Sequence, residues 1–422
     1  MWESLLKLFR IPDLKRRILF TLFMLVLFRV GAHIPVPGID SRALADVFSQ
    51  GGILGFLDMF AGGALSNFSI LALGIVPYIN ASIIIQLLTA VIPSLEELSR
   101  SGEEGRDKIA QYTRWFAIVL ALVQGFGITS WIEGMGVVLY PGWGYRVTVL
   151  LTLTAGTISL MWLGELITDL GVGNGTSLII FAGIVARVLP QLVRTFSLIK
   201  VGEINLLYFI LSLVMNVAII AVVVAFQEAQ RRIPVQYSKR VVGRKMYGGQ
   251  STHIPIRIVQ GGVLPIIFAS SILLFPATLA QFFQGSKVMA SIASALSPNS
   301  PLYLSLYAAL IIFFTYFYTA VSFNPVELAE NMQKYGGFIP GIRPGRPTVE
   351  YLDRTLSRIT LWGALFLTFI AIVPNIITDL TKVTTFYFGG TAILIMVGVA
   401  IETVRQLEAQ LLMRHYEGFI RK

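Results

Sequence analysis

The sequence predicts an all-α polytopic membrane protein, and three observations support this fold class. Apolar residues make up 55% of the 422-residue chain and charged residues only 13%, against about 25% in soluble domains. Mean hydropathy is +0.74. The apolar residues are also gathered into long runs. A soluble fold could not cover so much apolar surface with so few charges.

Ten of these runs are long enough to cross a bilayer, whose core of about 30 Å needs about 20 helical residues. We predict transmembrane helices at 18–34, 68–93, 115–132, 147–168, 176–195, 206–226, 262–283, 302–323, 359–377 and 385–404. The first run is not expected to be a cleaved signal peptide, because Arg29 lies within it and no small-residue cleavage motif follows.

The distribution of Lys and Arg predicts the orientation of the helices. If the N-terminus is cytoplasmic, the cytoplasmic segments hold 25 of the 33 basic residues. Cytoplasmic loops of membrane proteins carry such an excess. Ten helices with both termini in the cytoplasm are therefore expected.

Ten spans divide into two sets of five, an N-terminal half at 1–195 and a C-terminal half at 206–422, joined by a predicted hinge at 196–205. Because five is odd, the halves must enter the membrane from opposite sides, so related halves would be inverted repeats with a working site between them. Gly62-Gly63-Ala64-Leu65 and Gly261-Gly262-Val263-Leu264 open the second and seventh spans. This similarity supports a repeat, although chance resemblance between two apolar sequences explains it equally well.

The start of the second span is broken. Residues 59–67 are apolar but rich in glycine, and Gly74 and Pro77 follow before the apolar run resumes. Non-helical backbone at membrane depth is tolerated only where protein or a watery cavity covers it. We expect a re-entrant segment with little packing, which serves either as a stopper in a cavity or as a purely structural element.

The polar residues of the spans limit what could be transported. They are Asn80, Gln86, Gln124, Glu165, Asp169, Asn174, Asn216, Ser270 and Ser271. Ion-coupled carriers place ionisable groups near the midplane. Of these candidates Glu165 and Asp169 are ionisable, and they lie at a predicted helix end where water solvates them. A channel is therefore favoured over a secondary transporter of a small solute, which remains the alternative.

No enzymatic site is expected. The chain has no Cys and only three His, which excludes thiol catalysis and makes a metal cluster improbable. It also lacks a phosphate-binding G-x-x-x-x-G-K-[ST] motif. No catalytic residue, metal or cofactor is predicted, and the energy for transport must come from a partner or a gradient.

Two long predicted cytoplasmic loops, 227–261 and 324–358, are basic and rich in Gly and Pro. Ordinary orientation bias explains part of this charge. Two such loops also suit docking of an anionic partner, such as ribosomal RNA, an acidic protein surface or anionic lipid. Aromatic residues are not interleaved with the cations, so sequence-specific reading of RNA is not expected.

A series of blocks along the chain resembles the SecY family of bacterial protein-conducting channels. The blocks are Leu14–Arg17, Ile34–Asp40, Met59–Ser66, Leu73–Ile79, Met161–Glu165, Gly173–Gly175, Gln250–His253, Phe323–Pro325, Pro340–Gly345 and Phe386–Thr391. They occur in order and each falls in the expected span or loop. The resemblance implies two five-helix halves around an hourglass pore, through which unfolded polypeptides cross the membrane and apolar helices leave sideways into lipid.

The resemblance also implies site residues. A pore ring would comprise Ile75, Ile79, Thr176, Ile180, Ile267 and Ile395, of which Thr176 departs from the aliphatic pattern. A plug, about 56–67, would include Met59, Phe60, Ala61, Gly62, Gly63, Ala64, Leu65, Ser66 and Asn67. Polar candidates at a lateral gate between spans 2 and 3 and spans 7 and 8 are Gln86, Asn174, Ser270 and Ser271.

Partners follow from the same resemblance. Arg244, Lys245, Arg343 and Arg346 match basic positions that would engage the motor ATPase SecA or the ribosome. The small membrane partners would be SecE and SecG, and the substrates signal sequences and unfolded polypeptides. The expected location is the bacterial cytoplasmic membrane, in contact with its lipids, with both termini in the cytoplasm.

Overall fold

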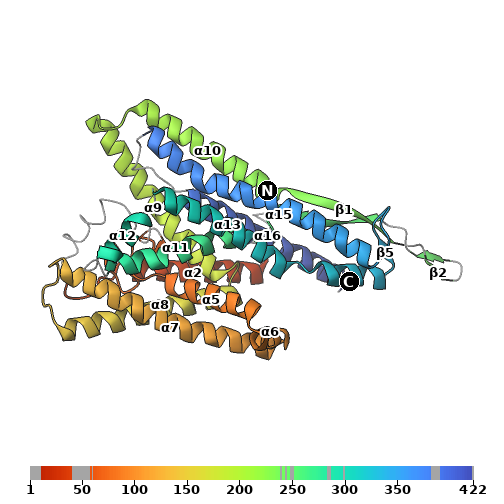
Figure 1. Cartoon of the computed structure of the whole chain (residues 1–422), viewed down its shortest axis with the longest axis horizontal. Helices are drawn as coiled ribbons and strands as arrows, with labels where there is room; N and C mark the ends of the chain where they lie inside the picture. The colour runs from red at the N-terminus through yellow and green to blue at the C-terminus, as the bar shows by residue number, and fades with distance from the viewer. Residues whose placement is uncertain are drawn as a thin grey trace.

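A computed structural model gives the fold, and it describes residues 11–39, 58, 60–237, 240–242, 245–247, 251–282, 287–297, 300–381 and 390–420. Its long helices run side by side as a bundle, and a group of short strands extends from one end of that bundle (Figure 1). The expected helical architecture is confirmed.

The N-terminal half consists of helices joined by short turns. They are α2 (Pro12–Gly31), α5 (Val76–Val91), α6 (Pro93–Arg100), α7 (Glu103–Gly134), α8 (Trp143–Leu170) and α9 (Gly175–Val201). Prolines at the first turns of α2, α5 and α6 suit their places, because the amide of a first-turn residue has no helical acceptor to lose.

The C-terminal half contains the remaining helices and all the strands. The helices are α10 (Leu206–Glu228), α11 (Leu264–Phe282), α12 (Lys287–Ala295), α13 (Pro301–Ser322), α14 (Pro325–Lys334), α15 (Arg346–Thr381) and α16 (Gly390–Ile420). The strands are β1 (Gln230–Tyr237), β2 (Arg240–Val242), β3 (Lys245–Tyr247), β4 (Ser251–Arg257) and β5 (Gly337–Phe338).

Each of the ten predicted spans contains a helix. By length and apolar composition six helical segments can cross a membrane: α7, α8, α9, α10, α13 with α14, and α15. A seventh is added if α5 and α6, which are bent by 101° to each other, form one span. The predicted spans at α2, α11 and α16 are helical but do not meet the same criteria within the described residues. The chain is a multi-pass membrane protein.

The predicted hinge at 196–205 is mostly helix. Helix α9 continues to Val201, and α10 begins at Leu206 after Asn205, whose side chain accepts a hydrogen bond from the amide of Leu207. The non-helical link is therefore residues 202–205, where Gly202 ends α9 with a φ of +84°. Residues 196–201 are therefore helical, and the hinge role of 196–205 stays a prediction.

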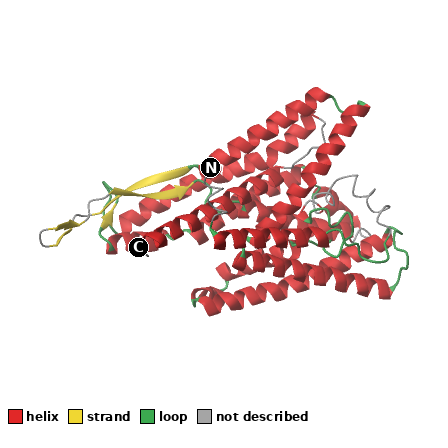
Figure 2. Ribbon diagram, turned by 180° about the vertical axis from the view of Figure 1, so that it is seen from behind, coloured by secondary structure: helices red, strands yellow, loops and turns green. Residues whose placement is uncertain are grey.

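The two predicted loops are folded and form an arm with a small core of its own. Strands β4, β1 and β5 make an antiparallel sheet in that order, and β2 and β3 make a separate hairpin. The strands lie at one end of the molecule (Figure 2). Ile233, Val235 and Ile256 pack against Met332 of α14 and Leu352 of α15. The all-α expectation therefore holds for the bundle and not for the arm.

Most of the bundle shares one buried apolar cluster. Its members come from α2, α5, α7, α8 and α9 of the first half and from α10, α11, α13, α15 and α16 of the second. The segment 60–75, which we call the re-entrant segment, forms turns inside this cluster, with four of its residues at positive φ (Gly62, Gly63, Phe68 and Gly74).

Backbone hydrogen bonds of the re-entrant segment are satisfied by protein. The amides of Val36 and Ile70 bond the carbonyls of Phe68 and Ile34 at 2.9 and 3.0 Å, and the amide of Ser69 bonds the carbonyl of Ala64 at 2.8 Å. These bonds replace the helical ladder that non-helical backbone lacks at membrane depth. The segment is therefore an integral part of the fold.

We predict that Gly156→Ala destabilises the protein. A Cβ at Gly156 of α8 would lie 1.9 Å from the carbonyl oxygen of Ile70 in the re-entrant segment, and overpacking of this kind costs about 1–3 kcal/mol. Thermal unfolding in detergent, followed by size-exclusion fluorescence, should show a lower midpoint. Gly144→Ala in the first turn of α8 is the control, because nothing lies within 4 Å of its Cβ. Equal midpoints for both variants would contradict the close approach.

Candidate functional site

Five of the six residues predicted for the pore ring are buried in the extended apolar cluster that both halves share. Ile75, Ile79, Ile180, Ile267 and Ile395 are each at most 3% exposed and belong to the same apolar cluster. They lie at the N-terminal end of α5 and within α5, α9, α11 and α16, so both halves of the chain contribute. The ring therefore remains a prediction that this clustering supports.

Thr176, the sixth residue predicted for the ring, lies beside helix α8. Its Oγ1 lies 3.5 Å from the position of a Cβ on Gly164 of α8, and the residue is only half-buried. The threonine therefore lies against the neighbouring helix, which explains why the aliphatic pattern breaks at this position. The place of Thr176 in the ring stays a prediction.

The expectation that residues 59–67 pack loosely is wrong for those that the structure describes, all but Met59. Phe60, Ala61, Ala64 and Leu65 are at most 2% exposed. A Cβ on Gly62 would lie 2.8 Å from the Cα of Gly183 in α9. The glycines permit this close backbone contact, so they indicate tight packing where the sequence suggested mobility.

Three charged residues that the sequence did not single out hold the re-entrant segment. The Oδ2 of Asp58, a fully buried residue, lies 2.6 Å from Nη2 of Arg187 on α9, and Oδ1 accepts the amide of Ser66 at 2.8 Å. Arg29 of α2 donates to the carbonyl oxygen of Gly62 at 2.7 Å. The sequence signals that could have identified these residues were the isolated Asp58 beside an apolar run and the position of Arg29 and Arg187 inside predicted spans. We call Asp58 and Arg187 the segment clasp.

The two halves meet at a seam between α5 and α7 on one side and α11 and α13 on the other. The hydroxyl of Tyr318 on α13 donates to Oε1 of Gln86 on α5 at 3.0 Å. The ring of Tyr318 also contacts that of Phe268 edge to face, at 5.3 Å between centroids. Gln86 thus lies at this seam, where it is bonded to Tyr318, a partner that the sequence did not identify. Its role in a lateral gate stays a prediction.

Ser270 and Ser271 lie on α11, one of the seam helices. Both are buried, and the hydroxyl of Ser270 donates to the carbonyl of Ile267 in its own helix at 2.9 Å. Nearby, a small void of about 20 Å³ lies between the re-entrant segment, α5, α7 and α11, which is room for about one water. Gln124 of α7 and Thr278 of α11 line it. The seam is therefore closed and mostly apolar.

Asn174 is not at this seam. Its side-chain oxygen accepts the amide of Ser177 at 3.0 Å and so caps the first turn of α9. Helix α9 packs mainly against α8 and α16, away from the seam helices. The prediction for Asn174 is wrong because an asparagine beside glycines fits a helix cap as well as a gating contact.

The docking candidates lie on the arm, where the structure describes two of their side chains. Arg343 is exposed in the turn before α15, and its carbonyl accepts the hydroxyl of Thr348 at 2.9 Å. Gly341 and Gly345 on either side have φ of +83° and +95°. Arg346 is 91% exposed and lies 3.5 Å from Glu350. Arg244 lies outside the described residues, as does the side chain of Lys245.

The arm is tied to the bundle where α10 ends. Nη2 of Arg405 on α16 donates to the carbonyl of Gln227 at 2.9 Å and to Oε1 of Glu228 at 2.8 Å. Arg257 at the end of β4 is exposed and close to this group. Desolvation, followed by repulsion from Arg405, lowers the pKa of Arg257 from its ordinary value. The base of the arm is thus fixed, while the turn with Arg343 and Arg346 is exposed.

Within the described ranges no three His, Asp or Glu side chains gather as metal ligands do. The polar groups of the seam and of the clasp are hydroxyls, amides and one ion pair, none of which forms a nucleophile–base arrangement. Physically, this arrangement suits a closure that can open. The buried aliphatic cluster and the clasped segment would seal it, and the weakly bonded seam would be the part that opens.

Sequence comparison gives close relatives over the whole chain. The SecY family model matches residues 69–404. The protein translocase subunit SecY of Thermus thermophilus is 49% identical over 99% of this chain and 97% of its own length. The subunit of the same name from Escherichia coli K12 is 48% identical over 97% of this chain and 94% of its own.

Solved structures share the fold. A structure described as a protein conducting channel has a TM-score of 0.69 at 19% identity, covering 94% of this chain and 92% of that one. Sec61 in the canine ribosome-channel complex from the endoplasmic reticulum has a TM-score of 0.65 at 18% identity, with the same coverage. With the family model matched over most of the chain, these findings lead to one conclusion: the chain belongs to the SecY family.

Proposed function

We propose that this chain is the channel-forming subunit of a protein translocase, which passes unfolded secretory polypeptides across the membrane and releases apolar helices sideways into it. The observation that carries the proposal is the joint burial of five isoleucines from both halves beside a re-entrant segment. Two relatives that match nearly the whole chain are named protein translocase subunits. A small-solute transporter, the alternative weighed from the sequence, gains no support from them.

The isoleucine cluster suits the pore ring of such a channel. An apolar constriction excludes water and therefore ions. Its side chains are flexible enough to move apart when a polypeptide passes, and they return to contact afterwards because burial of apolar surface is favourable. Residues 60–67, clasped through Asp58, act as the plug on this proposal.

The seam suits the lateral gate. Hydrogen bonds between membrane helices are worth about 0.6 kcal/mol on average, so the bond between Gln86 and Tyr318 is a weak closure. The remaining described contacts of the seam are mostly apolar, and lipid or an apolar signal helix can replace them at little cost. Opening would expose the path between α5 and α11 to the bilayer.

We infer that the partners act on the arm and on the outer faces of the bundle. The basic residues Arg343, Arg346, Arg244 and Lys245 would dock the motor ATPase SecA or the ribosome. SecE and SecG would be the small membrane partners. Two of the structural neighbours are described in ribosome complexes. The proposed location is the bacterial cytoplasmic membrane with both termini inside. The chain would be a conduit without catalysis of its own, driven by its partner.

Opening the ring should raise the resting ion conductance. The variant Ile79→Ser with Ile267→Ser should increase the conductance of the idle channel severalfold in planar bilayers, because two polar side chains would hydrate the constriction. Leu151→Ser with Val214→Ser is a matched control on outward-facing sites, 61% and 58% exposed in the isolated chain. If the conductance equalled that of the control, the constriction would be formed by residues other than these isoleucines.

Breaking the segment clasp should also produce a leak. In Arg187→Gln the buried carboxylate of Asp58 loses its partner, a change that costs about 3–5 kcal/mol for a buried pair. We expect the segment to be displaced, with raised resting conductance and faster labelling of a cysteine placed at Ser66. Arg187→Lys should retain most of the seal.

The matched control for the clasp is Arg194→Gln, on the same helix α9 but with an exposed side chain. It should conduct like the parent. If Arg187→Gln and Arg194→Gln gave the same conductance and the same labelling rate, the clasp would not hold the segment.

Reversing the charge of Arg343 should prevent docking without harming the fold. Exposed residues change stability by about 0.5 kcal/mol or less when replaced, whereas truncating a docked and desolvated charge pair costs about 2–5 kcal/mol. Arg343→Glu should keep normal thermal stability and nearly abolish motor-driven translocation of a secretory precursor into vesicles. Reversal at Arg244 or Lys245 should weaken it less, because neighbouring cations substitute.

Arg354→Glu, on the exposed face of α15, is the control for the Arg343 variant and should translocate normally. Full translocation by Arg343→Glu at a fixed motor concentration would remove this turn from the docking surface. The basic charge of the turn would then serve only to orient the helices in the membrane.

A further inference from the structure

A buried hydrogen bond joins a seam helix to a helix of the isoleucine cluster. The hydroxyl groups of Tyr307 on α13 and Thr391 on α16 lie 2.9 Å apart, and the two residues are 3% and 5% exposed. Helix α13 is one of the seam helices, and Thr391 precedes Ile395 of the cluster by one helical turn. The bond therefore connects the seam with the isoleucines.

The position of Thr391 in its helix explains why it bonds a residue of another helix. Threonines further along these helices, such as Thr315 of α13 and Thr403 of α16, donate to the carbonyl one turn earlier. Thr391 lies in the first turn of α16, where no earlier helical turn supplies a carbonyl. Its hydroxyl bonds Tyr307 instead. Because the pair is buried, water is not at hand to replace the bond, and the two residues should move together.

Helix α16 packs against both halves of the chain. Its main neighbours among the described residues are α10 and α15 of the C-terminal half and α9 of the N-terminal half. Helix α13, in contrast, packs mainly on α11 and α15, within its own half. When the halves separate, contacts of α16 alone would therefore not decide which half it follows.

Further along α16, Thr403 lies against the N-terminal half. A Cβ on Gly173, in the turn between α8 and α9, would be 3.2 Å from Oγ1 of Thr403. A hydrogen bond stabilises this turn, from the amide of Gly175 to Oγ1 of Thr168 at 2.9 Å. The turn is thus a firm support for this part of α16.

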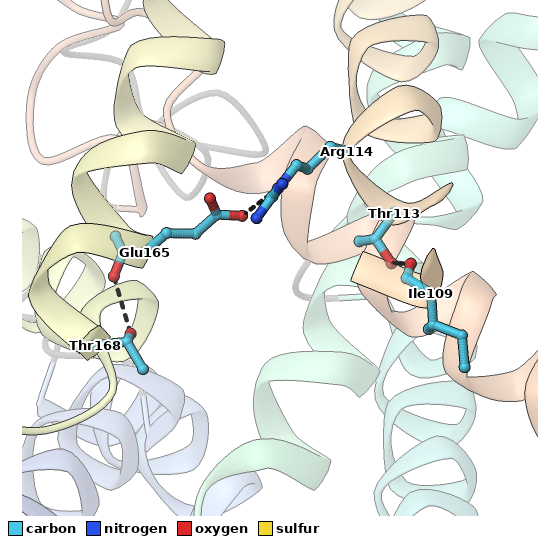
Figure 3. Close-up of polar contacts among 6 residues, drawn as sticks. Ile109, Thr113, Arg114, Glu165 and Thr168 are labelled. Atoms are coloured by element: carbon cyan, nitrogen blue, oxygen red, sulfur yellow. Dashed lines mark hydrogen bonds and ion pairs between the residues drawn. The ribbon is translucent and has the colours of Figure 1, made fainter. Parts of the chain in front are cut away.

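Helix α7, which forms the opposite wall of the seam, is also tied to α8. Nε of Arg114 donates to Oε1 of Glu165 at 2.8 Å, and the two side chains point toward each other from neighbouring helices (Figure 3). The seam wall on α7 and the turn that supports Thr403 therefore belong to one set of connected helices, α7 to α9.

Helix α16 is thus held at two points by different halves of the chain. At 1.5 Å per residue, Thr391 is about 18 Å and Ile395 about 12 Å from Thr403 along the helix. If the seam parts, Tyr307 carries Thr391 with α13 while Thr403 stays against the turn at Gly173. Ile395 would then move by about two thirds of the displacement of Thr391, in proportion to these lengths.

We propose that Tyr307 and Thr391 are positioning residues that couple opening of the seam to opening of the pore ring. This inference rests on the proposed function, because it needs both a ring and a lateral gate. With the bond in place, a segment that parts the seam also moves Ile395 out of the constriction. Without the bond, the seam can part while α16 stays against α9 and the ring stays closed.

Separate measurements of the seam and of the ring can test the coupling. The chain has no native cysteine, so spin labels can be attached to cysteines placed at Val119 of α7 and Val321 of α13. These sites are 52% and 65% exposed in the isolated chain, and the distance between the labels reports the width of the seam. Conductance in planar bilayers reports the ring. Both are measured on the chain reconstituted with its small membrane partners, before and after addition of a synthetic signal peptide.

In the parent we expect the peptide to lengthen the label distance and to raise the conductance. Tyr307→Phe and Thr391→Val should keep the longer distance and the resting conductance, but the increase in conductance should fall at least about fivefold, as for a lost allosteric coupling. The double variant should be no worse than either single variant, because all three lack the same bond. Thr391→Ser retains the hydroxyl and should behave like the parent.

Tyr316→Phe is the matched control. Tyr316 is also on α13, but its hydroxyl bonds the carbonyl of Ser357 on α15 at 3.3 Å, so this variant should conduct like the parent. A normal increase in conductance in Tyr307→Phe, or loss of the seam opening together with the conductance, would overturn the inference and leave the proposed function intact. A parent that responds to the peptide in neither measurement would overturn the proposed function, and this inference with it.

Discussion

The structure depends on one constraint: backbone that is not helical must be placed inside a membrane protein without exposing its polar groups to lipid. The re-entrant segment meets it through bonds to residues 34–36 and to itself, and through close contact of Gly62 with Gly183. Helices from both halves must surround it, since an unsatisfied group in hydrocarbon costs several kcal/mol. The shared apolar cluster and the closed seam therefore follow from the presence of this segment.

The contacts that close the seam are weaker than those that hold the re-entrant segment. Among the described residues the seam is held by one hydrogen bond between side chains and by apolar contact. Separating it therefore costs little where lipid or an apolar helix takes its place. The re-entrant segment is held by an ion pair whose carboxylate is fully buried. Leaving a buried charge unpaired costs about 3–5 kcal/mol. Thermal motion can thus part the seam far more often than it can displace the segment.

Composition, apolar run length and the placement of cations predicted the bundle, because each follows from the bilayer as solvent. The resemblance then located the isoleucines, which no pattern could separate from lipid-facing ones. Side-chain pairings between distant segments could not be predicted from the sequence. Tyr318 with Gln86 and Arg187 with Asp58 are examples, because both depend on how those segments pack. Single-residue errors had local causes. Asn174 caps a helix, and Gly62 allows close contact with Gly183 where loose packing was expected.

Two arginines have different roles in the arm, one at its base and one in an exposed turn. Arg405 fixes the base of the arm by bonding the carbonyl of Gln227 and the carboxylate of Glu228, while Arg343 between two positive-φ glycines stays exposed. A force applied to the arm by a docked partner would therefore reach α10 and α16, both of which pack in the bundle. Because Ile395 belongs to α16, that force has a direct mechanical route to the isoleucine cluster, and no movement of the re-entrant segment is needed to start it.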